Sequence, residues 1–240
     1  MRVKAVIEYD GSKFYGFQKQ NSTPYTVTTQ LELALKSIKI DSSIVGSGRT
    51  DRGVHASGQV IHFDIPSFWE NISKLKYVLN QKLKSIKIKH ITKVDTNFHA
   101  RFSAKKRVYR YIFKTSSLSV FEQNYISYYP PFDASKLHLA LKLFIGQHDF
   151  ALFYKTGSLT HTTIRTIYNS RYIKRGDYHY IYFEANGFLR SQVRMMVDAS
   201  MQVAKGELSI NELKTQIKTI HQYSTRLAPP SGLYLAKIIY

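Results

Sequence analysis

One carboxylate lies among cationic and glycine residues in the stretch Gly48-Arg49-Thr50-Asp51-Arg52-Gly53-Val54-His55. Adjacent opposite charges favour the ionised form of a carboxylate, the form that acts as a nucleophile or a base. The glycines permit turns that a Cβ would forbid and let a bulky partner approach. The stretch therefore indicates a catalytic loop around Asp51. The alternative is an ordinary turn, in which the aspartate caps a backbone N–H and the arginines are solvated.

Two further residues have side chains suited to chemistry on a nucleic-acid base. Tyr109 follows a run of basic residues, and its ring could stack on a base, although strand spacing slightly favours an inward-packing tyrosine. Arg194 falls on a largely apolar predicted helix, where a guanidinium is costly unless it is paired. Pairing with Asp51 would satisfy both charges; an exposed helical arginine is the simpler alternative.

The composition favours a polyanionic partner. The 240 residues include 35 Lys and Arg against 16 Asp and Glu, a formal charge of +19, and contain 18 Tyr and 14 Phe. Cations beside aromatic rings suit phosphate contact and base stacking, and an anionic membrane surface is the other partner of this class. The absence of cysteine excludes disulfides and thiolate metal sites. Without a signal peptide or an apolar run of about 20 residues, we expect a cytoplasmic protein that does not enter a membrane.

Neither a metal nor a nucleotide cofactor is expected. The chain has no HExxH, GxxxxGK[ST] or GxGxxG motif, and we interpret the scattered His55, His62 and His99 as structural or RNA-contacting residues.

Hydrophobic periodicity predicts the order β-α-β-β-α-β twice, which is the ferredoxin-like unit. The basic connector 97–107 separates the two halves, and we predict an α+β protein with domains 1–103 and 104–240. The two RRM-like antiparallel sheets are expected to meet at a central RNA-binding cleft. The expected strands are 3–9, 42–45, 59–65, 86–94, 108–113, 164–173, 178–184 and 233–239, and the expected helices are 27–38, 69–83, 133–146, 187–205 and 209–220.

Several motifs in this order resemble the tRNA pseudouridine synthase A (TruA) family. The resemblance covers nearly the whole chain and includes the Asp51 stretch itself. The other matching segments are Glu8–Ser12, Gly16–Gln20, Gly58–Val60, Phe98–Ala104, Tyr109–Tyr111, Gly146–Phe150, Phe188–Leu189, Val193–Arg194 and Gly232–Leu235.

The resemblance implies an isomerase that converts uridine to pseudouridine at positions 38 to 40 of the tRNA anticodon stem-loop, without cofactor or metal. It implies that Asp51 is the catalytic aspartate and that Tyr109 packs on the target base. Arg49 would take the place of the flipped nucleotide, Arg194 would pair with the aspartate, and Leu233 would form an apolar wall. It also implies a homodimer that binds tRNA across both subunits.

The chain departs from the family pattern near these positions. Arg52 replaces a small residue, Phe17 a tryptophan and Thr28 a glutamine, and the segment 187–192 lacks the usual His-Met pair. Two other functions compete with the isomerase. A non-catalytic RNA-binding protein is disfavoured because the RRM aromatic octapeptide is absent, and a metal-dependent nuclease because no carboxylates cluster near Asp51 in the sequence.

Overall fold

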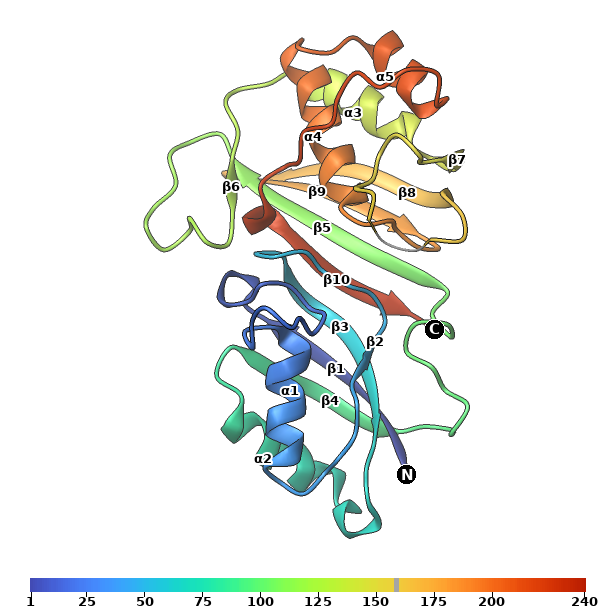
Figure 1. Ribbon diagram of the computed structural model, residues 1–240. Helices are drawn as coiled ribbons and strands as arrows, with labels where there is room; N and C mark the ends of the chain where they lie inside the picture. The colour runs from blue at the N-terminus through green and yellow to red at the C-terminus, as the bar shows by residue number, and fades with distance from the viewer. Residues whose placement is uncertain (158–159) are drawn as a thin grey trace. The chain divides into compact units, whose positions relative to one another are not determined.

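The computed structural model describes residues 1–157 and 160–240, which form two compact units. The first unit comprises Met1–Lys105 together with Leu235–Tyr240, and the second comprises Lys106–Tyr234. The division therefore falls two residues beyond the expected one at 103, and residues 235–240 group with the first unit instead of the second. Both units mix helices with antiparallel strands, which confirms the α+β class (Figure 1).

The first unit has the predicted ferredoxin-like arrangement. β1 pairs antiparallel with both β3 and β4, and the very short β2 pairs with β3, giving the order β4-β1-β3-β2. β10 also lies beside β3. Alternate residues of β1 are buried, so one face of the sheet forms the core under α1 and α2. The elements are β1 (Arg2–Tyr9), α1 (Val27–Lys36), β2 (Val45–Gly46), β3 (His55–Asp64), α2 (Ile72–Lys82), β4 (Ile86–Lys93) and β10 (Leu233–Ile239).

The second unit repeats the β-α-β-β-α part of the pattern with additions, and the expected last strand is β10, most of which groups with the first unit. β5, β9 and β8 are antiparallel neighbours, and the predicted β8–β9 hairpin turns at Gly176 and Asp177. The expected helix 209–220 is α5, while the short strands β6 and β7 were not predicted. The elements are β5 (Lys106–Lys114), β6 (Ser127–Tyr128), α3 (Ala134–Leu143), β7 (Gly146–Asp149), β8 (Ile164–Arg175), β9 (Tyr178–Ala185), α4 (Gln192–Lys205) and α5 (Ile210–Ile217).

Local side-chain chemistry sets the helix ends. Ser209 and Glu212 form a capping box at the start of α5, and Gly206 closes α4 with a φ of 77°. The prediction that α4 begins at Gly187 was wrong. Ser191 adopts a φ of 61°, which interrupts any helix, and the Gln192 side chain instead accepts the N–H of Leu189 at 2.7 Å.

No helix in the described ranges 1–157 and 160–240 combines the length and the apolar character needed to cross a membrane.

The N-cap of α3 tests whether a single side chain stabilises the start of a helix in this protein. Asp133 Oδ1 accepts the N–H groups of Ser135 at 2.8 Å and Lys136 at 3.1 Å. Asp133→Ala should lower the free energy of unfolding in urea by about 1 kcal/mol, because both donors lose their acceptor. Asp133→Asn keeps an acceptor oxygen and should cost clearly less. Equal losses in the two variants would contradict the capping role.

Candidate active site

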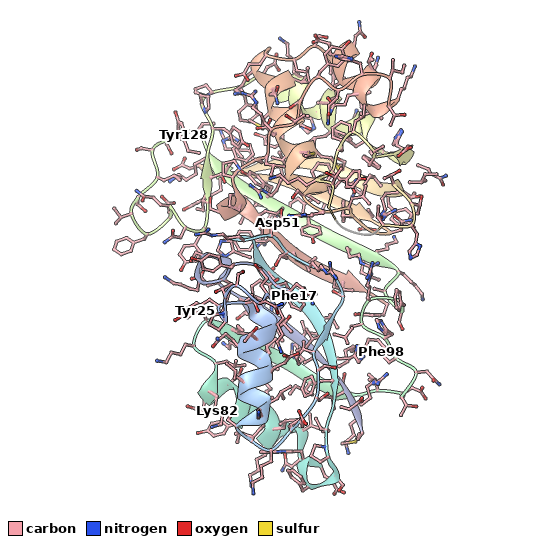
Figure 2. The ribbon with its side chains drawn as sticks, in the orientation of Figure 1. Phe17, Tyr25, Asp51, Lys82, Phe98 and Tyr128 are labelled. Atoms are coloured by element: carbon pink, nitrogen blue, oxygen red, sulfur yellow. The ribbon has the colours of Figure 1, made fainter. Side chains whose placement is uncertain are left out.

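Asp51 lies in the loop that joins β2 to β3 (Figure 2). Its side chain is half-buried, the preceding Thr50 is buried, and Arg49 and Arg52 on either side are exposed. The Val54 N–H donates to the main-chain carbonyl of Asp51 at 3.1 Å, which closes a tight turn. A turn is therefore present, and the main-chain carbonyl of Asp51 closes it.

The aromatic loop, residues Asp10–Gln20, holds the Asp51 loop from one side. The Phe17 N–H donates to the Thr50 carbonyl at 3.1 Å. Gly16 has a φ of 114°, and a Cβ at this position would lie 3.0 Å from the Thr50 oxygen and 3.6 Å from the carbonyl carbon of Asp51. Only a glycine lets the two backbones approach this closely without strain.

The aromatic loop is itself attached to the first turn of α1. The main-chain N–H of Thr28 donates to the Phe17 carbonyl at 3.0 Å, and the Thr28 hydroxyl donates to the same oxygen at 2.7 Å. The Val27 N–H donates to the Gly16 carbonyl at 3.2 Å. Helix α1 therefore fixes the loop that fixes Asp51.

Buried polar side chains hold the Asp51 loop from the sheet side. Gln59 of β3 accepts from the Ser47 hydroxyl at 2.6 Å and donates to the Gly48 carbonyl at 2.8 Å. The Tyr9 and Thr50 hydroxyls lie 2.8 Å apart in the core. Burial raises the pKa of Tyr9, so its hydroxyl stays protonated and neutral. These groups leave the loop little freedom to move.

The sequence analysis did not identify Tyr9, Thr50 and Gln59 as residues that support the site. Tyr9 resembled any inward-facing strand tyrosine, and a polar residue such as Gln59 carries no signal of burial. His55 is buried and its Nδ1 accepts the Gly11 N–H at 2.9 Å, which is a structural role.

The departure at Arg52 has a local explanation. Its guanidinium carbon lies 4.3 Å from the ring centre of Tyr15, a cation–π contact with the aromatic loop. Arg52 therefore links the two loops at the surface, and Arg49 on the other side of Asp51 is exposed.

The other predicted site residues, Tyr109, Arg194 and Leu233, belong to the second unit. Tyr109 lies on β5, is 8% exposed, and alternates with the buried Tyr111 and Phe113. Its ring meets Phe188 edge to face with 5.2 Å between the centroids. Tyr109 therefore packs inward on β5, as the alternative in the sequence analysis described. Its ring contacts Phe188, which lies in the segment before α4.

Arg194 occupies the first turn of α4 and is half-buried. Its Nε donates to the carbonyl of Ala228 at 2.7 Å, and the Ala228 N–H donates to the Arg194 carbonyl at 3.1 Å. Burial raises the pKa of the Tyr111 hydroxyl, and the nearby Arg194 guanidinium opposes part of that shift. Arg194 therefore has hydrogen-bonding partners and is not a solvated surface arginine.

Leu233 begins β10 and is 4% exposed. The preceding Gly232 passes so close to β5 that a Cβ would lie 2.6 Å from the Ile112 carbonyl and 2.9 Å from the Tyr111 ring. The chain before Leu233 is thus pressed against the strand that carries Tyr109.

No group of three His, Cys, Asp or Glu side chains suited to a metal ion occurs within the described part of the chain.

Comparisons with known proteins show that the sequence is similar to tRNA-modifying enzymes. Residues 5–103 and 140–240 match the family model described as tRNA pseudouridine synthase. A relative from Wolinella succinogenes is 40% identical over 98% of this chain and 93% of its own length. One from Campylobacter jejuni is 40% identical over the full length of both chains, and one from Leuconostoc citreum is 37% identical over 100% and 97%. All three are named tRNA pseudouridine synthase A.

The close approach at Gly16 can be tested by stability. Gly16→Ala should lower the free energy of unfolding in urea by about 1–2 kcal/mol, because a left-handed φ and a 3.0 Å contact both penalise the new methyl group. Gly48→Ala, in the Asp51 loop itself, is the matched control, since a Cβ there meets nothing within 4 Å. A Gly48 variant as unstable as the Gly16 variant would contradict the argument.

Proposed function

This chain belongs to the tRNA pseudouridine synthase family of isomerases acting on tRNA, and we propose that Asp51 is its catalytic carboxylate and that its target uridines are positions 38 to 40 of the anticodon stem-loop. The observation that carries the proposal is the loop around Asp51. It presents a half-buried carboxylate between two exposed arginines. Hydrogen bonds from β1 and β3 hold this loop, and α1 holds the aromatic loop that contacts it.

The reaction needs an anionic oxygen in a fixed position. Pseudouridine formation breaks the N1–C1′ bond, turns the uracil, and joins C5 to C1′; C5 then loses a proton and N1 gains one. An ionised carboxylate acts either by adding to the base or by attacking C1′, and both routes require it to be held against the nucleotide. No cofactor or metal takes part in the proposed reaction.

A uridine in a stem must leave its stack before it can react, at a cost of a few kcal/mol. We assign Tyr109 to stacking on the extruded base, which offsets about 1–3 kcal/mol of that cost. Arg49 occupies the space that the flipped nucleotide leaves. Its exposure beside Asp51 supports this role.

Arg194 pairs with the Asp51 carboxylate in the proposed reacting complex, and Leu233 forms an apolar wall against the uracil. The hydrogen bond from Arg194 Nε to the Ala228 carbonyl supports the first assignment, because it orients the guanidinium before the substrate binds. Burial of Leu233 at the start of β10 supports the second.

The protein is proposed to work as a cytoplasmic homodimer that binds one tRNA with both subunits. The charge of +19 supplies affinity for the phosphate backbone without reading its sequence. Sedimentation of the purified protein with and without tRNA would show whether a dimer is present.

Replacing the proposed catalytic oxygen gives the first functional test. Asp51→Asn should reduce pseudouridine formation in an anticodon stem-loop RNA by more than about a thousandfold, since the amide is not a nucleophile. Its affinity for tRNA should stay nearly unchanged. Asp41→Asn, which makes the same change at an exposed carboxylate outside the loop, should be fully active. Normal turnover by the Asp51 variant would remove this residue from the mechanism.

The Tyr109 ring gives the second test. Tyr109→Phe retains the stacking face and should keep most activity, whereas Tyr109→Ala should lose roughly 10- to 100-fold in kcat/KM. Circular dichroism of both variants checks that β5 remains folded. If the alanine and phenylalanine variants were equally active, the ring would have no role at the base.

A further inference from the structure

An aromatic stack lies in the first unit, outside the residues assigned to catalysis. It is formed by His62 of β3 with His99 and Phe102 of the connector 97–107. The rings of His62 on β3 and His99 have centroids 5.0 Å apart, and His99 and Phe102 stack at 4.3 Å with 28° between their planes. His62 is buried, His99 is half-buried and Phe102 is 76% exposed. The stack therefore runs from the core to the solvent and ends in an accessible ring.

Hydrogen bonds fix the orientation of the stack. His99 Nδ1 accepts the N–H groups of Arg101 and Phe102, both at 3.2 Å. His62 Nδ1 accepts the Ala100 N–H at 3.1 Å. Burial lowers the pKa of His62, so the innermost ring is neutral at pH 7. Phe102 therefore packs on a histidine ring whose orientation is fixed by hydrogen bonds, and the Phe102 ring stays exposed to solvent.

A cation lies over this exposed ring, and another lies over two other aromatic rings of the first unit. The Arg101 guanidinium carbon lies 5.5 Å from the Phe102 ring centre. The Lys4 ammonium lies over the rings of Phe98, which contacts His62, and Tyr240, at 5.7 and 5.5 Å. An open aromatic face beside cationic side chains is the combination that binds an unpaired nucleobase and its phosphate.

The stack is distant from the Asp51 loop. His62 follows His55 by seven residues on β3, a separation of roughly 20 Å along the strand. Phe98, on the same connector, likewise lies apart from Asp51 (Figure 2). A base bound here would belong to a different nucleotide from the one undergoing isomerisation.

We propose that Phe102, stacked on His99, binds an unpaired base of the tRNA, while Arg101 contacts the adjoining phosphate. This second contact holds the RNA while the target uridine leaves its stack. It rests on tRNA as the substrate, and it does not depend on the role of Asp51 or on which uridine is modified.

Direct binding tests this surface. Phe102→Ala should weaken the Kd for a full-length tRNA transcript about tenfold, with kcat at saturating tRNA unchanged. Phe68→Ala is the matched control, because Phe68 is a 64% exposed phenylalanine of the same unit beside another ring, Trp69. It should bind like the wild type. An unchanged Kd for the Phe102 variant would overturn the proposal. A lower kcat with an unchanged Kd would overturn it too, because Phe102 would then act in the reaction and not in tRNA binding.

Two further variants separate a base from a protein partner. Phe102→Trp should retain affinity, and its added indole fluorescence should be quenched by tRNA. Phe102→Leu keeps an apolar side chain without a π face and should bind as weakly as alanine. Full affinity in the leucine variant, or loss of a dimer by Phe102→Ala in sedimentation, would show an apolar protein contact and refute base stacking.

Discussion

The hydrogen bond from the Phe17 N–H to the Thr50 carbonyl is the contact on which the proposed site depends. It joins the aromatic loop to the Asp51 loop at a point where Gly16 leaves no room for a side chain. Helix α1 fixes the first loop through Thr28, and Gln59 of β3 fixes the second. A carboxylate placed by elements this rigid needs little reorganisation when the substrate binds, which is the condition for electrostatic catalysis.

Two departures from the family pattern meet at one carbonyl oxygen. Thr28 donates both its amide N–H and its hydroxyl to the main-chain carbonyl of Phe17. Arg52 adds a cation–π contact from the Asp51 loop to Tyr15. The three substitutions therefore concern the attachment of the aromatic loop and leave the carboxylate itself unchanged.

The sequence predicted most of this fold because its signals are local. Alternation in β1, the N-cap at Asp133 and the capping box at Ser209 each depend on neighbouring residues alone. The start of α4 was wrong because the apolar pattern from Gly187 continues into the helix, whereas Ser191 leaves the helical region and the Gln192 amide provides another partner. Asp51 was identified by its motif. Its support by Tyr9 and Gln59 is a long-range contact that no local pattern encodes.

The path of β10 has a consequence for synthesis. Residues 235–240 belong to the first unit, where Lys105 donates its N–H to the Ile239 carbonyl and the Tyr240 hydroxyl donates to the Ala100 carbonyl. Gly58 of β3 makes room for the backbone at Ala236. The ribosome makes these residues after those of the second unit, so the first unit cannot complete its sheet until the second unit has been synthesised. Until then the part of the β3 edge near Gly58, which β2 does not reach, has unpaired backbone groups that could pair with another chain.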